Sequence, residues 1–130
     1  MLTKADLIWN RACAAWRNGS ANLLAGDKAL AALLDFHSPA MNGGPWHAVE
    51  LLGPDVEDTA SGYRFFGFDE VADLLDRITA AMAAIKSDDA LNALEAELDN
   101  RYGRLIPWDT TLSERFEAYL RDHPEEFAPL

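Results

Sequence analysis

The chain has 130 residues and a mass of 14.4 kDa, the size of one ordinary domain, and 49% of its residues are hydrophobic, which is enough to fill a core. Its net charge of −11 argues against direct binding to nucleic acid or to an anionic membrane. No apolar run reaches the roughly 18 residues that a membrane helix needs, and the first residues do not resemble a signal peptide. We therefore expect a cytoplasmic protein, in which the single cysteine, Cys13, is a buried thiol.

The acidic excess lies in the second part of the sequence. Residues 1–50 contain four basic and four acidic groups, whereas the remainder contains 18 acidic and seven basic groups. This distribution predicts an asymmetric electric field around the protein. Because no internal repeat or low-complexity linker divides the chain, we expect one domain over residues 1–130.

Apolar residues recur at helical spacing along the chain, and β-branched runs with period two are absent, which favours an all-α fold. Thr3 with Asp6, and Thr111 with Glu114, have the spacing of capping boxes, and Ser87 is a further N-capping residue. We predict a compact bundle of about six helices, with these spans: 3–17, 27–37, 45–52, 69–85, 87–103 and 111–123.

Helix-breaking residues set the predicted helix ends. We expect Asn18-Gly19 to end the first helix, Ser38-Pro39 the second, Gly103 the fifth and Pro124 the last. Residues 54–64 form the least regular stretch, and we predict no more than a single helical turn there.

The span 69–85 shows the clearest periodicity. Its apolar residues repeat at alternating spacings of three and four and predict one buried stripe: Phe68, Val71, Leu75, Ile78, Met82 and Ile85. Four carboxylates fall on the opposite face, where solvent is expected: Asp69, Glu70, Asp73 and Asp76. The next helix adds further acids: Asp88, Asp89, Glu95 and Asp99.

Rows of carboxylates at this spacing suggest a phosphate-like surface for a basic partner. One helical turn separates the carboxylates by about 5–6 Å. A single copy of the chain would carry about half the charge of duplex DNA of the same length, and a homodimer would come closer. The alternative is that acidic helix faces keep a small protein soluble.

Motifs for chemistry are weak. His37, His47 and His123 lie far apart and lack metal-ligand spacing, so we expect no metal and no cofactor. Residues 55–66 do not form a calcium loop because Ala60 and Phe66 occupy two required positions. Asn42-Gly43-Gly44 is predicted to be a tight turn beneath Trp46, with glycines that supply positive φ.

Several segments of the sequence resemble one known family. They are Asn42-Gly43-Gly44, Phe66-Gly67-Phe68-Asp69-Glu70-Val71-Ala72, Leu94-Glu95-Ala96-Glu97-Leu98-Asp99-Asn100-Arg101-Tyr102 and Tyr119-Leu120-Arg121-Asp122-His123-Pro124-Glu125-Glu126-Phe127. In this order they are similar to the small acidic all-α DNA-mimic domain, whose known member occupies the DNA-binding surface of a helix-turn-helix regulator. The resemblance implies an all-α fold and a basic protein partner. Pro45 and Trp46 depart from the family, which usually follows the glycine pair with Phe.

The leading hypothesis is therefore a non-enzymatic protein that blocks the nucleic-acid surface of a basic protein, such as a DNA-binding regulator. The expected contacts are Asp69, Glu70, Asp73, Asp76, Asp88, Asp89, Glu95 and Asp99. One alternative is an immunity or antitoxin protein that neutralises a toxin or nuclease, through a few aromatic and acidic hot spots. A last alternative is an enzyme built around His47 and the glycine turn, which would need a perturbed ionisable group beside that turn.

Overall fold

The computed structural model describes residues 1–15, 22–84 and 87–130, and every regular element in them is helical. The α-helices are α1 (Lys4–Cys13), α3 (Ala25–Gly43), α4 (Pro45–Leu52), α5 (Val56–Phe65), α6 (Asp69–Ala84), α7 (Asp88–Leu105) and α8 (Asp109–Asp122). Two short 3₁₀ helices, η1 (Gly53–Asp55) and η2 (Pro124–Glu126), complete the set. The predicted all-α bundle is confirmed.

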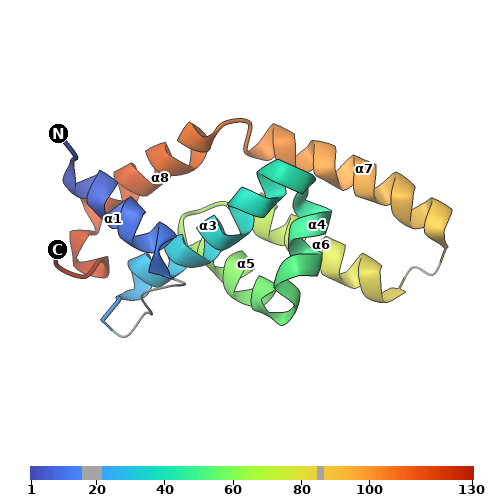
Figure 1. Cartoon of the computed structure of the whole chain (residues 1–130), viewed down its shortest axis with the longest axis horizontal. Helices are drawn as coiled ribbons and strands as arrows, with labels where there is room; N and C mark the ends of the chain where they lie inside the picture. Colours follow the sequence, from blue (N-terminus) through green and yellow to red (C-terminus); the bar gives the residue numbers. More distant parts are fainter. Residues whose placement is uncertain (16–21, 85–86) are drawn as a thin grey trace.

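Helix α3 runs through the middle of the molecule and contacts α1, α4, α5 and η2 (Figure 1). Helices α6 and α7 lie antiparallel at one end, and α4 and α5 pack against α6. Helices α1 and α8 lie at the opposite end with both chain termini (Figure 1). In the described part of the chain, no helix combines the length and the apolar character that a membrane span requires.

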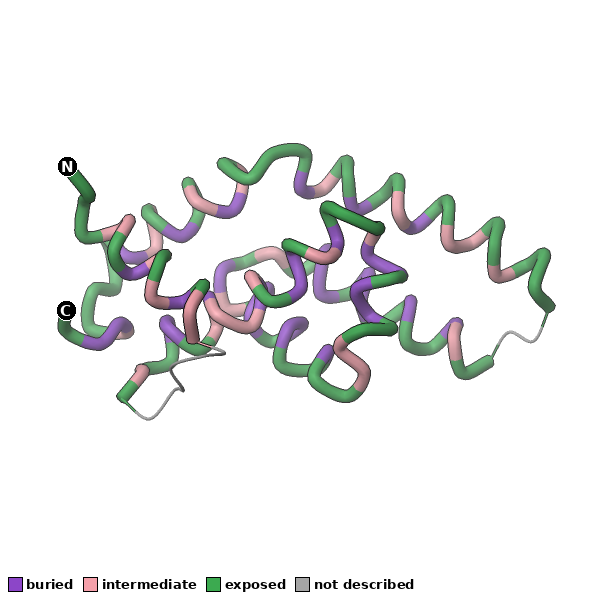
Figure 2. The backbone as a smooth tube through the Cα atoms, viewed as in Figure 1, coloured by how far each residue is buried: buried purple, intermediate pink, exposed green. Residues whose placement is uncertain are grey.

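The core lies between these helices, and buried residues face inward from each of them (Figure 2). Phe36, Tyr63 and Tyr102 form an aromatic centre in which Phe36 meets both tyrosine rings edge-on. The stripe predicted on α6 is confirmed at Val71, Leu75 and Ile78, whereas Phe68 and Met82 are half-buried and Ile85 lies outside the described residues. These contacts leave the acidic face of α6 exposed.

Pro39 does not end α3, contrary to the prediction. The helix continues to Gly43 with Pro39 in its interior. Proline removes one hydrogen bond from the helix, but His37 and Ala40 on either side of it are buried, so packing keeps the helix in place. The predicted turn at Asn42-Gly43-Gly44 is therefore shorter than expected, because Asn42 and Gly43 belong to the last turn of α3.

Residues 54–64 also differ from the prediction, because most of them form α5. Val56, Thr59, Ala60 and Tyr63 are buried at spacings of three, four and seven. Gly62 allows α5 to approach α3 closely, since a Cβ atom there would lie 2.5 Å from the Ala29 carbonyl oxygen. Tertiary packing thus overrides a sequence whose Ser, Thr and Gly residues are weak helix formers.

Helix ends were predicted with mixed success. The Thr3–Asp6 capping box of α1 and the Ser87 cap of α7 are confirmed. Helix α7 continues past Gly103 to Leu105, where a buried Ile106 follows. Helix α8 starts at Asp109, two residues before the predicted Thr111, and it ends before Pro124 as expected. The expected end of the first helix at Asn18-Gly19 lies outside the described residues.

Cys13 is exposed at the end of α1, so the prediction of a buried thiol is wrong. Ile8 and Ala12 are the buried residues of this helix, and Cys13 follows Ala12 on a different side. Partial burial, and then the nearby Asp35 carboxylate, raise the pKa of the Cys13 thiol. It is therefore a weak nucleophile at neutral pH.

Asp27, at the start of α3, joins three distant segments of the chain. One carboxylate oxygen accepts a hydrogen bond from Arg11 Nη2 at 2.6 Å, and the other accepts from the Ala128 and Leu24 amides at 2.7 and 3.1 Å. Arg11 also donates to the carbonyl groups of Ala128 and Pro129, both at 3.0 Å. Because Asp27 is only 1% exposed, this carboxylate depends on its protein partners. The clamp fastens α1 and the C-terminal segment to α3.

Replacing Asp27 with alanine should lower the free energy of unfolding by about 3 kcal/mol, because Arg11 and the Ala128 amide lose a buried acceptor. Urea unfolding followed by circular dichroism measures this change. Asp122→Asn, which changes an exposed acid on α8, is the control and should stay within about 0.5 kcal/mol of the wild type. Equal stabilities of the two variants would contradict the role of the clamp.

Candidate functional site

The acidic row predicted on α6 is exposed, but Arg64 neutralises part of it. Arg64 reaches from α5 and donates hydrogen bonds to Asp76 at 2.8 Å and to Asp73 at 3.3 Å. These bonds raise the pKa of the Arg64 guanidinium. Among the described residues, Asp69 and Glu70 have no cationic side chain within ion-pair distance, and they begin α6, where its dipole favours negative charge.

The acids of α7 form a second group. Asp88 and Asp89 are exposed at its N-terminus, and Glu95 is half-buried one to two turns further on. Glu97 pairs with Arg77 of α6 at 3.6 Å, which joins the two helices across their surface. At 1.5 Å per residue, Asp69 at the start of α6 lies about 22 Å along the helix axis from Ala84 at its end.

Asp99 is half-buried and lies against the N-terminus of α4. Its carboxylate accepts a hydrogen bond from the Trp46 amide at 3.4 Å, and burial raises its pKa. It also lies against Gly44, where a Cβ atom would come within 2.7 Å of the carboxyl group. Gly44 alone in the Asn42-Gly43-Gly44 segment has positive φ, at 90°, while Trp46 is part of the core. Asp99 is therefore a capping residue that positions α4.

The eight predicted contact residues thus do not form one cluster. The structure places four of them on α6, three toward the start of α7, and Asp99 against α4. Helices α6 and α7 together carry nine carboxylates and three arginines, a net charge of −6. The acids therefore form two exposed groups, one along α6 and one near the start of α7.

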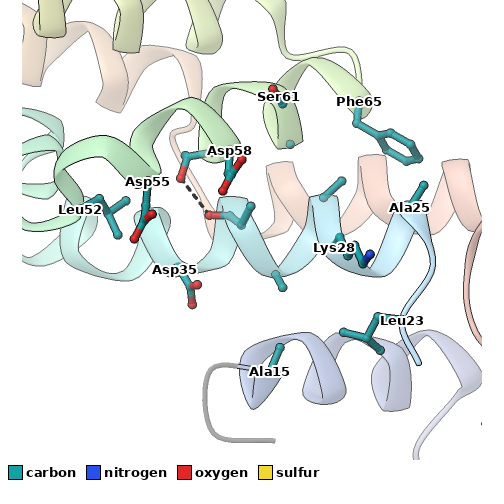
Figure 3. A pocket seen from close by; sticks show the side chains of 15 residues that line it. Ala15, Leu23, Ala25, Lys28, Asp35, Leu52, Asp55, Asp58, Ser61 and Phe65 are labelled. Atoms are coloured by element: carbon teal, nitrogen blue, oxygen red, sulfur yellow. Dashed lines mark hydrogen bonds between the residues drawn. The ribbon is translucent and has the colours of Figure 1, made fainter. Parts of the chain in front are cut away.

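A third acidic group was missed by the sequence analysis. Asp35 of α3 lies beside Asp55 and Asp58 at one end of a groove of about 640 Å³ between α3 and α5 (Figure 3). Burial, and then the charge of Asp55, raise the pKa of Asp35. These residues are up to 23 positions apart, and residues 54–64 were not predicted as a helix. No local sequence signal could therefore have brought them together.

Four side chains from α3, α5, α7 and α8 are joined by hydrogen bonds into a polar chain, in which Tyr63, Tyr102 and His37 are buried and Asp109 is exposed. Tyr63 and Tyr102 share a hydrogen bond of 2.7 Å between their hydroxyl groups, and the Tyr102 hydroxyl lies 2.9 Å from His37 Nδ1. His37 Nε2 lies 2.7 Å from an Asp109 carboxylate oxygen. Since an ionised Asp109 can only accept, Nε2–H is the donor there, and Nδ1 of a neutral ring accepts from Tyr102. Burial raises the pKa values of both tyrosines.

This chain borders a second groove, of about 440 Å³, between α3 and α8. Both nitrogens of His37 already have partners, so the ring has no free atom to offer a substrate. His47 is exposed and packs on Gly43, and His123 lies 3.6 Å from Glu125. Over residues 1–15, 22–84 and 87–130, no group of His, Cys, Asp or Glu side chains is arranged to hold a metal ion.

The fold and its surface define a small all-α protein with an acidic helix pair. A family model described as DMP19-like protein matches residues 21–123, and the chain therefore belongs to the DMP19-like family. The match includes every helix from α3 to α8, and most of the Asp27 clamp partners lie outside it. No curated protein and no solved structure matches the chain.

Replacing Tyr102 with phenylalanine should destabilise the protein more than the same change at Tyr63. Tyr102→Phe leaves both the Tyr63 hydroxyl and His37 Nδ1 buried without a partner, at a cost of about 2–3 kcal/mol. Tyr63→Phe removes only the hydroxyl at one end of this series of hydrogen bonds and leaves the Tyr102–His37 bond intact, at a cost of about 1 kcal/mol. Urea unfolding of both variants checks the order, and the reverse order would contradict the chain of hydrogen bonds.

Asp35→Asn should raise the melting temperature at pH 7. The pKa of Asp35 is higher in the folded than in the unfolded protein, so the folded state binds its proton more tightly. The wild-type protein is therefore most stable below pH 3.8, the ordinary pKa of an aspartate, and loses stability as the pH rises through the higher pKa that Asp35 has in the folded state. The asparagine variant does not titrate and avoids this loss. Thermal unfolding should show the two proteins converging below pH 3.8, and a gap that widened there would contradict the assignment.

Proposed function

We propose that this protein is a DNA mimic, which binds a basic protein and occupies its nucleic-acid-binding surface. The family name supports this proposal, since DMP19 stands for DNA mimic protein 19. The observation that carries it is the acidic surface of the α6–α7 pair, where the carboxylates follow two long helices. The partner is a basic DNA-binding protein such as a helix-turn-helix regulator.

The number of charges fits such a partner. Helix α7 is about 27 Å long, a length over which duplex DNA carries about 16 charges. The net charge of −6 on the two helices is well below that density. However, a DNA-binding protein typically contacts about 6–10 phosphates, and the eight carboxylates of α6 and α7 other than Asp99 fall within that range. The mimic therefore needs to reproduce the contacted phosphates and not the whole duplex.

The contacts that we propose are the predicted acids without Asp99, which is committed to α4. They are Asp69, Glu70, Asp73, Asp76, Asp88, Asp89 and Glu95. We further propose that the protein acts by binding alone, without catalysis or a cofactor, in the cytoplasm. Long-range attraction between such charges makes binding sensitive to salt.

The triple variant Asp69→Asn, Glu70→Gln, Asp73→Asn should bind the partner at least about tenfold more weakly, because three exposed charges are removed. The wild-type protein, immobilised, captures the partner from lysate of the source cell, and a salt gradient releases it for mass spectrometry. The captured protein is then bound to labelled DNA, and displacement of that DNA is titrated with each variant.

The control is Glu114→Gln, Glu117→Gln, Asp122→Asn, which removes the same charge from exposed positions on α8. Displacement of DNA by the wild type and the control, and not by the α6 variant, is the expected result. Capture of a toxin or nuclease whose inhibition survives high salt would support the immunity alternative. Equal displacement by both variants would show that α6 is not the mimic surface.

A further inference from the structure

Arg64 already occupies part of the surface that we propose for the basic partner. Its Nη2 atom donates to Asp76 at 2.8 Å and to Asp73 at 3.3 Å, so one guanidinium nitrogen bridges the two carboxylates. Among the seven proposed contacts, and within the described residues, these two are the ones that form an ion pair. A basic side chain is therefore seen to fit this place on α6.

The spacing of the two acids explains why a cation is favoured there. Asp73 and Asp76 are three residues apart on α6, and like charges that are neighbours on a helix surface destabilise the helix. Arg64 lies on α5, which packs against α6, and its positive charge offsets this repulsion. Arg64 thus does in the free protein what a basic side chain of the partner would do in the complex.

The bridge is open to water. The Arg64 side chain is 43% exposed, and those of Asp73 and Asp76 are 75% and 62% exposed. Exposed ion pairs contribute little stability because water and salt screen them, so a competing cation can replace Arg64. The contrast is with the ion pair of Arg11 and Asp27, whose carboxylate is only 2% exposed and out of reach of a partner.

We propose that Arg64 is an intramolecular competitor, which a basic side chain of the partner displaces from Asp73 and Asp76 when it binds. This proposal deepens the DNA-mimic proposal and rests on it, because it concerns the same surface. A partner cation placed beside these carboxylates while Arg64 remained there would face a like charge at close range. Arg64 therefore lowers the affinity of the acidic surface for its partner.

A labelled hexa-arginine peptide tests this proposal without the natural partner. Its affinity is measured by fluorescence anisotropy at about 0.15 M ionic strength, where a Debye length of about 8 Å limits the effect of distant charges. Arg64→Gln should bind the peptide about three- to fivefold more tightly than the wild type, because no exposed ion pair has to be broken first. The control Arg121→Gln removes the same charge from an exposed position on α8 and should change the affinity less than about 1.5-fold.

A second background separates competition from a simple gain of negative charge. In the variant Asp73→Asn, Asp76→Asn both carboxylates are removed, so adding Arg64→Gln should change the affinity no more than Arg121→Gln does. An equal gain in both backgrounds would overturn the proposal, and so would weaker binding by Arg64→Gln. All of these positions are exposed, so the variants should fold, and circular dichroism checks this.

NMR spectra of the ¹⁵N-labelled protein follow the Arg64 side chain directly. Its signals are assigned by their loss in Arg64→Gln. When unlabelled hexa-arginine is added, they should move toward the positions that they have in the Asp73→Asn, Asp76→Asn variant, where the guanidinium has lost both acceptors. Signals that stay in place at saturating peptide would show that Arg64 is not displaced, and would overturn the proposal.

The DNA-displacement assay separates this proposal from the DNA-mimic function. The expected result is displacement by the wild type, with Arg64→Gln acting at an about three- to fivefold lower concentration than Arg121→Gln. Displacement by the wild type with equal potency of these two variants would overturn the competition and leave the function standing. Absence of displacement by the wild type, with the peptide results as expected, would overturn the function and leave the competition on α6 standing.

Discussion

A chain of hydrogen bonds, buried at three of its four side chains, fixes how four helices of this protein meet. It runs from Tyr63 through Tyr102 and His37 to Asp109, and these residues come from α5, α7, α3 and α8. A buried hydroxyl or imidazole without a partner is costly, so α3, α5 and α7 are held in the positions that pair Tyr63, Tyr102 and His37. The position of α7 follows from Tyr102, and the acidic pair α6–α7 is held against the body of the protein at that point.

The sequence was sufficient to predict the helices that carry a regular apolar stripe. Helix α6 is the best case, since Val71, Leu75 and Ile78 repeat at helical spacing and bury as expected. Helix α5 was not predicted because its buried face includes Thr59 and Gly62. These residues stabilise the helix through contact with α3 and not through their own helix propensity. The predicted helix end at Pro39 was wrong for a related reason, because a local rule for proline cannot account for the buried residues around it.

The sequence predicted which acids of the candidate site are exposed on α6, but it did not predict which acids lie together in space. Exposure of Asp69 and Asp73 follows from periodicity, which one helix determines by itself. The inward turn of Asp99 depends on the N-terminus of α4, 53 residues away, and the grouping of Asp35 with Asp55 depends on the crossing of α3 and α5. The net charge of residues 1–50 is zero, but Asp35 nevertheless joins an acidic group of the second part. Charge along the chain is thus a poor guide to charge in space.

The Asp27 clamp has a consequence for how the protein is made. Asp27 receives one of its hydrogen bonds from Ala128, 101 residues away in the sequence, and Arg11 donates to Pro129, 118 residues away. During synthesis from the N-terminus these partners emerge from the ribosome long after Asp27 and Arg11. Helices α1 and α3 can therefore form early, but the second oxygen of Asp27 receives the Ala128 amide only after residue 128 has been synthesised. Until then water has to donate a hydrogen bond to this oxygen of Asp27, so α1 and α3 are joined less firmly than in the complete fold.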